Sequence, residues 1–229
     1  MHILITDSGV GGLSVCAAAE RFFRTHGSDE PIQLTYVNAS PENDFGYNAM
    51  GSTQAKIEHF DRFLHIITDR FAPDQIYIAC NTLSVLLQDT VFFSSEELPV
   101  RGIVETGVHR MVRDLEERPD SAAIIFGTPT TIDAGTYPKE LEAAGISPGR
   151  IISQSCPGLA DTISEDRQGA TARAQITDFV DRAVNAMAGT NATCLALLAC
   201  THYGYRKDFF ADALAAAGLG CKILNPNEF

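Results

Sequence analysis

The sequence predicts an α/β fold made of two pseudo-symmetric, open, mostly parallel sheet domains with helices on both faces. Short apolar runs typical of buried strands alternate along the whole chain with longer segments of helical periodicity. Two of these runs end in a cysteine followed by small polar side chains, at Cys80 and at Cys200. Each cysteine lies 72 residues after a hydroxyl residue that follows an earlier apolar run, Ser8 and Thr128 respectively. Matched spacing and matched residue types indicate an internal duplication.

The first half begins directly with a strand and continues through a Gly-rich turn, Asp7–Gly12, into a helix. We predict strands at His2–Thr6, Ile32–Val37 and Gln75–Ala79, and helices at Leu13–His26, Ser52–Phe71 and Thr82–Phe92. In the second of these helices, apolar side chains recur at spacings of three and four on one face. The polar segment Asn38–Gly51 is long enough to indicate a functional loop.

The second half repeats the alternation after a hinge at Glu96–Pro99. Its predicted strands are Val100–Ile103, Ala122–Phe126, Ile151–Ser153, Cys194–Ala199 and Lys222–Leu224, and its predicted helices are Val104–Glu117, Thr130–Ala144 with a break near Gly135, Pro157–Ser164, Thr171–Ala188 and Asp208–Ala217. We expect residues 1–98 with 206–229 to form the first domain and residues 99–205 the second. The active site is expected in the cleft between them, because ligands bind at the carboxyl ends of strands in open α/β sheets.

Composition excludes several classes of function. Apolar residues make up 45% of the 229 residues and charged residues 20%, as in a globular protein with a proper core. No uncharged apolar stretch is long enough to span a membrane, and the N-terminus lacks a signal pattern, so we expect a cytoplasmic protein. The net charge of −12, without a Lys/Arg cluster, argues against nucleic acid and anionic membranes as partners. An anionic small molecule remains feasible, because backbone N–H groups bind carboxylates.

The six cysteines show no CxxC pairing, and in a cytosolic chain we expect free thiols. Four of them are expected to be small core residues, namely Cys16, Cys156, Cys194 and Cys221. Cys80 and Cys200, if they lie on opposite walls of one cleft, suit inversion of configuration at a carbon atom between them. One thiolate removes a proton from a carbon and the other thiol delivers a proton to the opposite face.

An unperturbed cysteine, with a pKa of about 8.5, is only a few per cent thiolate at neutral pH. Each reacting cysteine therefore needs a neighbour. Asp7 is placed to serve Cys80, and His202 is placed to serve Cys200.

Other interpretations of the same residues stay open. The cysteines are structural if they only fill the ends of buried strands. A zinc site from Cys80, Cys200 and His202 lacks an obvious fourth ligand and compact spacing. A hydrolase or amidase needs one cysteine with one histidine, which leaves the second cysteine idle. The Gly-rich turn matches neither a dinucleotide fingerprint nor a P-loop, and it fits either anion binding or a tight chain reversal.

Four groups of residues together carry a family resemblance. They are Asp7-Ser8-Gly9-Val10-Gly11-Gly12-Leu13-Ser14-Val15, Ala79-Cys80-Asn81-Thr82, Gly127-Thr128 with Thr131-Ile132 and Tyr137, and Cys200-Thr201-His202-Tyr203. In this order they resemble the glutamate racemases of the cofactor-independent aspartate/glutamate racemase superfamily. The resemblance implies 1,1-proton transfer between two α/β domains without cofactor or metal. It assigns Cys80, assisted by Asp7, as the base toward the D-enantiomer and Cys200, assisted by His202, as the base toward the L-enantiomer.

The resemblance also implies a substrate-binding set and a biological role. The implied contacts are Asp7, Ser8, Phe45, Gly46, Asn81, Thr82, Thr131, Thr201 and His202. The implied partner is a small amino-acid substrate. The implied role is the supply of D-glutamate for peptidoglycan in the cell wall. A homodimer is compatible with the sequence.

The chain departs from the family pattern in three places. Asp44-Phe45-Gly46 stands where the family has Pro-Tyr-Gly, which adds a negative charge near the expected position of the substrate's side-chain carboxylate. Ser164 stands where the family has a glutamate, and the sequence ends at Phe229, about where the family adds a final helix. Glutamate is the first expectation for the substrate. The alternatives are aspartate or another small acid, or a poorly active acid-binding regulatory homologue.

Overall fold

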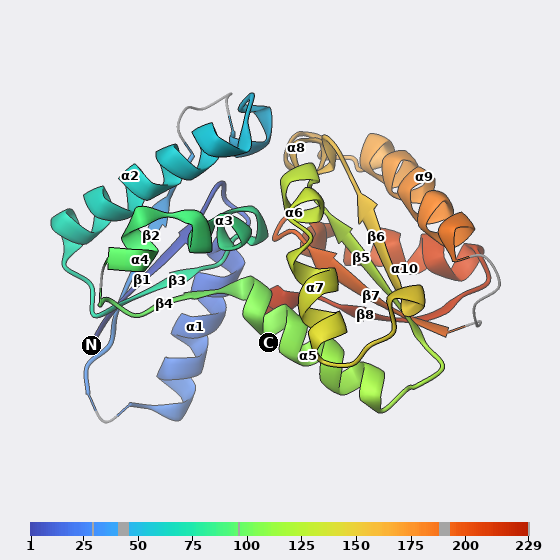
Figure 1. Ribbon diagram of the computed structural model, residues 1–229, viewed down its shortest axis with the longest axis horizontal. Coiled ribbons are helices and arrows are strands. Elements are labelled where there is room, and N and C mark those ends of the chain that lie inside the picture. The colour runs from blue at the N-terminus through green and yellow to red at the C-terminus, as the bar shows by residue number, and fades with distance from the viewer. Residues whose placement is uncertain (29, 41–45, 96, 188–192, 229) are drawn as a thin grey trace. The chain divides into compact units, whose positions relative to one another are not determined.

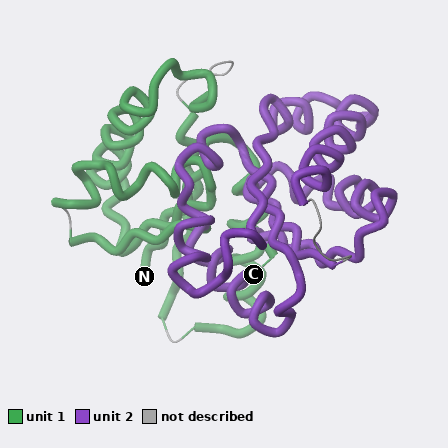
Figure 2. Tube along the Cα trace, turned by 45° about the vertical axis from the view of Figure 1, so that its right-hand side comes forward, with its two compact units in different colours: residues 1–103, 228 green, residues 104–227, 229 purple. Residues whose placement is uncertain are grey.

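The computed structural model describes residues 1–228 except 29, 41–45, 96 and 188–192. The chain divides into two compact units, which are coloured separately in Figure 2: unit 1 comprises residues 1–103 with 228, and unit 2 comprises residues 104–227. Each unit is built on a four-stranded parallel sheet, with the strand orders β2-β1-β3-β4 and β6-β5-β7-β8 (Figure 1). The predicted fold class is confirmed.

Unit 1 follows the predicted alternation of strands and helices, with one helix divided. Its elements are β1 (His2–Asp7), α1 (Leu13–His26), β2 (Gln33–Asn38), η1 (Tyr47–Ala49), α2 (Thr53–Phe71), β3 (Gln75–Ile78), α3 (Asn81–Leu86), η2 (Leu87–Asp89), α4 (Val91–Ser95) and β4 (Val100–Gly102). The single helix predicted over Thr82–Phe92 is wrong, because the chain turns at Thr90. The Thr90 hydroxyl donates to the Leu87 carbonyl and accepts from the Phe93 N–H, which ends one turn and starts α4.

Helices cover both faces of the first sheet, α1 on one side and α2 on the other (Figure 1). Ile3 and Ile5 of β1 belong to a core cluster with the apolar side of α1. The buried stripe of α2 consists of Phe60, Leu64 and Ile67. The hydroxyl of Ser52 caps α2 by accepting from the Ala55 N–H at 3.1 Å, which explains why this helix begins where the sequence predicts.

Unit 2 contains β5 (Ala122–Gly127), β6 (Ile151–Ser155), β7 (Thr193–Ala199), β8 (Gly220–Leu224), α5 (Ile103–Glu116, whose first residue belongs to unit 1), α6 (Pro129–Asp133), α7 (Thr136–Ala143), η3 (Pro148–Arg150), α8 (Leu159–Glu165), α9 (Ala170–Ala186), η4 (Tyr203–Arg206), α10 (Lys207–Ala216) and η5 (Pro226–Glu228, whose last residue belongs to unit 1). The predicted break near Gly135 is confirmed, because this glycine adopts a left-handed φ of 64° between α6 and α7. Side chains of α8, α9 and α10 pack into one core cluster with β5 and β7.

The boundary between the units differs from the predicted one at both places. β4 pairs with β3, so the first unit continues to residue 103 rather than ending at 98. β8 pairs with β7, and Phe210 and Leu214 of α10 are buried in the core of unit 2. Residues 206–227 therefore lie in the second unit, not in the first. Periodicity identifies a strand and a helix in this segment, but it does not determine which sheet an edge strand joins.

Two of the cysteines predicted to be free form a disulfide, Cys194–Cys221. They face each other in register on β7 and β8, with Cα atoms 4.5 Å apart. The sequence expectation failed because this pairing depends on β8 lying next to β7. Cys16, Cys80, Cys156 and Cys200 form no disulfide with any residue that the structure describes.

The 72-residue interval has a structural origin. In unit 1, Thr6 of β1 pairs with Ile78 of β3, and in unit 2, Gly127 of β5 pairs with Ala199 of β7. Both central strand pairs thus have the same register offset. The residues that follow them, including Cys80 and Cys200, are placed at equivalent ends of two sheets of the same topology.

Among the described residues, no helix combines the length and the apolar character needed to cross a membrane.

Candidate active site

The first half of the candidate site lies at the carboxyl ends of β1 and β3. Ser8 Oγ is 3.2 Å from Cys80 Sγ, and the Leu83 N–H donates to the same sulfur at 3.5 Å. Cys80 is thereby the N-cap of α3, which begins with the buried Asn81 and Thr82. All of these groups are predicted site residues except Leu83, which joins them because the chain enters a helix immediately after the cysteine.

The Gly-rich turn after β1 encloses the carboxylate of Asp7. This carboxylate is fully buried, and its Oδ1 accepts the Gly9 N–H at 2.8 Å. A Cβ on Gly12 would lie 2.7 Å from Asp7 Cβ and 2.9 Å from Asp7 Oδ2, so a larger residue does not fit without displacing Asp7. The Gly9 N–H therefore binds the protein's own carboxylate.

Burial and charge suppress the ionisation of Cys80. Removal from water, and then the nearby Asp7 carboxylate, raise the pKa of this thiol to about 12, although hydrogen bonds from Ser8 and Leu83 partly offset the rise. In the protein without a ligand, the Asp7 carboxylate therefore opposes ionisation of the Cys80 thiol. A cation placed between Asp7 and Cys80 would reverse the sign of the local field.

The second half of the site lies at the carboxyl ends of β5 and β7. Cys200 Sγ is 3.9 Å from Nδ1 of His202, and Thr201 between them is buried. On the neighbouring strand end, Thr128 Oγ1 lies 3.0 Å from Thr131 Oγ1. The structure therefore places His202 next to Cys200, and Thr131 next to Thr128.

Three side chains to which the sequence analysis gave no role support the turn that carries Cys200. Tyr203 belongs to the quoted motif, whereas Asn225 and Asn227 were not singled out. The hydroxyl of Tyr203 donates to the Cys156 carbonyl at 3.3 Å, and Nδ2 of Asn227 donates to the Thr201 carbonyl at 3.0 Å. Asn225 is buried, and its Oδ1 accepts the Asn227 N–H at 3.2 Å. No local signal near residue 200 indicates a role for a segment 25 residues later.

Gly46 and Tyr47 follow the polar loop of unit 1. The predicted contact Phe45 lies outside the described residues. Gly46 has extended backbone geometry, and η1 begins after it with Tyr47, whose side chain is 1% exposed. The sequence analysis did not single out Tyr47.

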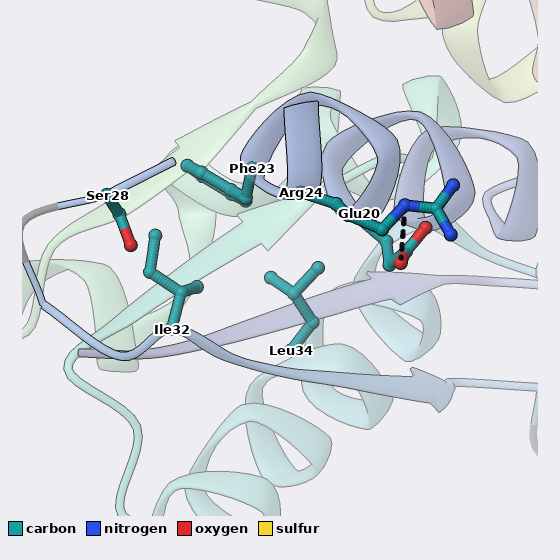
Figure 3. A pocket seen from close by; sticks show the side chains of 6 residues that line it. All are labelled: Glu20, Phe23, Arg24, Ser28, Ile32 and Leu34. Atoms are coloured by element: carbon teal, nitrogen blue, oxygen red, sulfur yellow. Dashed lines mark ion pairs between the residues drawn. The ribbon is translucent and has the colours of Figure 1, made fainter. Parts of the chain in front are cut away.

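The structure also has a pocket of about 440 Å³ between α1 and β2 (Figure 3). It is lined by Glu20, Phe23, Arg24, Ser28, Ile32 and Leu34. Ile32 lies just before β2 and Leu34 near its start, whereas Asp7 ends the parallel strand β1, so this pocket is at the opposite end of the sheet from Cys80. It includes none of the predicted site residues.

No group of three or more His, Cys, Asp or Glu side chains able to hold a metal ion occurs in the part of the chain that the structure describes.

Two parallel sheets of equivalent strand order, each with a buried cysteine just after its second central strand, define a duplicated α/β protein. No family model matches the chain. It is 27% identical to the glutamate racemase of Aquifex pyrophilus over 204 residues, which cover 89% of this chain and 71% of that protein. It is 28% identical to the glutamate racemase of Jannaschia sp. over 230 residues, which cover 93% and 77%.

Solved structures show the same fold. The glutamate racemase of Campylobacter jejuni superposes with a TM-score of 0.75 at 21% identity, covering 100% of this chain and 82% of that one. The glutamate racemase of Francisella tularensis in complex with D-glutamate gives a TM-score of 0.71 at 20% identity, covering 99% and 76%. The resemblance to the glutamate racemases is therefore confirmed: the chain is a homologue of these isomerases and has their fold.

Proposed function

We propose that this chain is a cofactor-independent amino-acid racemase that interconverts L- and D-glutamate by proton transfer at the α-carbon through Cys80 and Cys200. The observation that carries the proposal is the equivalent placement of these two thiols in a duplicated fold, each with a polar partner, Ser8 at 3.2 Å and His202 at 3.9 Å. Similarity to glutamate racemases in sequence and in fold supports it.

In the proposed reaction, Cys80 removes the α-proton of the D-enantiomer and returns a proton when the L-enantiomer reacts. A neutral thiol cannot act as the base, and the raised pKa of Cys80 keeps it neutral in the protein without a ligand. The α-ammonium group of an amino acid bound beside Asp7 would neutralise the buried carboxylate. It would thereby remove the charge that opposes the thiolate, so that substrate binding itself activates the base.

Cys200 acts on the opposite face of the α-carbon in this scheme. His202 takes the thiol proton and returns it, since its Nδ1 faces the sulfur. When one cysteine is the base, the other is the acid, and each proton removed from carbon is replaced on the other face. The two units must therefore bring both thiols to one substrate during the reaction.

The proposed binding groups carry no positive charge apart from His202 when it is protonated. Hydroxyls and amides from Ser8, Asn81, Thr82, Thr131 and Thr201 would hold the substrate, and no Lys or Arg is among them. Neutral donors are adequate for a carboxylate in a buried site, because hydrogen bonds to a charged group are stronger than those between neutral groups.

A direct test is to incubate the protein with single enantiomers of glutamate in deuterated water, without added cofactor. We expect loss of optical rotation together with deuterium at the α-carbon, measured by polarimetry and NMR. If neither enantiomer exchanges its α-proton, glutamate racemisation is excluded.

The two thiols are tested separately by Cys80→Ser and Cys200→Ser. General acid–base groups contribute about 10²- to 10⁴-fold, so each variant should lose at least about 100-fold of the racemisation rate. Cys16→Ser, which changes a half-buried free thiol of α1, is the matched control. Full activity in either variant would rule out the two-base mechanism.

A second candidate substrate is aspartate or another small acid. The observation that favours it is Asp44, whose charge would lie near the substrate's side-chain carboxylate if the loop is placed as in the resembling family. The same exchange experiment with aspartate separates the two candidates. A role in peptidoglycan synthesis is tested by rescue of a bacterial strain that needs added D-glutamate to grow.

A further inference from the structure

Tyr47 presents a buried hydroxyl that the proposed function does not yet use. The residue is 1% exposed, and its hydroxyl oxygen has no hydrogen-bond partner among the residues that the structure describes. A buried polar group without a partner is costly, and in a native protein it points to a role or to a bound molecule.

Its ring is held firmly in place. His59 and Phe60 of α2 pack against the ring in edge-to-face geometry, with centroid distances of 5.6 Å and 6.3 Å. Tyr47 begins η1 directly after Gly46, a position that the resemblance places at the substrate. The hydroxyl is therefore carried on a rigid ring at the end of the loop associated with the site.

The hydroxyl also lies within electrostatic reach of the Cys80 thiol. Burial, and then a charge on Cys80, raise the pKa of Tyr47 above its usual value. Tyr47 is therefore protonated at neutral pH and offers a hydrogen to a ligand. A negatively charged acceptor would gain most from it, because no Lys or Arg is among the proposed binding groups.

We propose that Tyr47 is a substrate-binding residue whose hydroxyl donates a hydrogen bond to a carboxylate oxygen of the acid bound next to Cys80. This inference rests on the proposed function and adds a specificity-determining group to it. The donor stands three residues after Asp44, whose negative charge has the opposite effect on a bound carboxylate.

Tyr47→Phe removes the hydroxyl and keeps the ring. If the hydroxyl binds substrate, KM for glutamate rises by about 10- to 100-fold, the range for loss of a hydrogen bond to a charged group. The melting temperature should stay the same or rise, because an unpartnered polar atom leaves the core. Tyr77→Phe is the control, because Tyr77 packs with the α1 side of the first sheet and should leave KM unchanged.

A second readout does not require turnover. Glutamate or aspartate should protect Cys80 from alkylation by iodoacetamide, and Tyr47→Phe should raise the concentration of acid needed for half protection. Protection without racemisation in the unmodified protein would refute the proposed function and leave the binding role of Tyr47 standing.

An unchanged KM and an unchanged half-protecting concentration in Tyr47→Phe would overturn the inference. So would a lower melting temperature with normal KM, since that result makes the hydroxyl a structural group. Absence of protection by either acid in the unmodified protein would overturn it as well.

Discussion

Ser8 Oγ and Cys80 Sγ lie 3.2 Å apart. The two residues are 72 positions apart in sequence, as are Thr128 and Cys200 in unit 2. The contact exists because β1 and β3 pair with this offset, and both residues follow directly at the strand ends. In unit 2 the equivalent strand end carries a threonine, whose hydroxyl contacts Thr131. The two halves therefore share a framework and differ in the groups that serve each thiol.

Ser8→Ala tests the support of the Cys80 thiolate. The hydroxyl lowers the pKa of Cys80, so its loss should raise that pKa further and slow alkylation of Cys80 by about tenfold at a given pH. Peptide mapping after timed exposure to iodoacetamide measures the rate, with Cys200 in the same sample as reference. The matched control is Ser164→Ala on the exposed side of α8. Equal slowing at both cysteines would contradict the assignment.

Asp7→Asn should have opposite effects on thiol acidity and on catalysis. Burial is the larger cause of the raised pKa of Cys80, and the Asp7 charge is the next, so removing the charge lowers this pKa and speeds alkylation. Racemisation should nevertheless fall by about 100-fold or more, because the substrate ammonium loses its counter-charge. Slower alkylation of Cys80 in this variant would show that Asp7 favours the thiolate after all.

Gly12→Ala tests the packing around Asp7. The added Cβ would meet the Asp7 side chain at under 3.0 Å and Ala79 Cβ at 3.1 Å, so the carboxylate must move. We expect loss of racemisation and a destabilisation of about 1–3 kcal/mol, as for overpacking of a filled core. Gly149→Ala is the control, because its Cβ would meet nothing within 4 Å. Activity and urea unfolding measured together check both effects.

Asn227→Ala tests the support behind the Cys200 turn. Without the hydrogen bond to the Thr201 carbonyl, the turn that carries His202 should lose its fixed orientation. We expect a lower kcat with little change in KM, and a changed pH profile of alkylation at Cys200 but not at Cys80. If both cysteines change together, the effect is a general loss of stability rather than local positioning.

Asp114→Asn tests an ion pair that ties α5 to β8. Nζ of Lys222 lies 2.6 Å and Nε of Arg110 3.3 Å from Oδ2 of this buried carboxylate. Burial alone would raise the pKa of Asp114, but hydrogen bonds and charges from Lys222 and Arg110 outweigh it and hold the pKa below its usual value. At neutral pH the variant should lose about 1–3 kcal/mol of unfolding free energy.

The unfolding free energy lost in Asp114→Asn should depend on pH in a definite direction. A carboxyl with a depressed pKa stabilises the fold above the unfolded pKa of about 3.9, and this contribution disappears as pH falls through the lower folded value. The difference between the unmodified protein and Asp114→Asn should therefore shrink below about pH 4. Urea unfolding at several pH values measures it, with the exposed Asp178→Asn as control. A difference that grows in acid would contradict the ion pair's role.

Much of the fold was predictable because its signals are local. The helix over Leu13–His26 agrees at both ends, and α2 differs from its prediction by one residue. Apolar periodicity and a capping serine determine these bounds without help from distant residues. The prediction failed at Thr90, where a side chain competes for backbone hydrogen bonds, and at β8, whose neighbouring strand is decided by packing.

The sequence by itself determined the duplicated alternation of strands and helices, and it determined that Cys80 and Cys200 occupy equivalent strand ends beside hydroxyl and imidazole groups. These properties follow from hydrophobic periodicity and from residue spacing, which are both features of the sequence itself. Tertiary structure decided that Asp7 opposes ionisation of Cys80, because the effect of a charge depends on distance and burial. It also decided that Cys194 pairs with Cys221 and that the Tyr47 hydroxyl is buried without a partner among the described residues. Each of these depends on segments far apart in sequence that meet only after the sheets have formed.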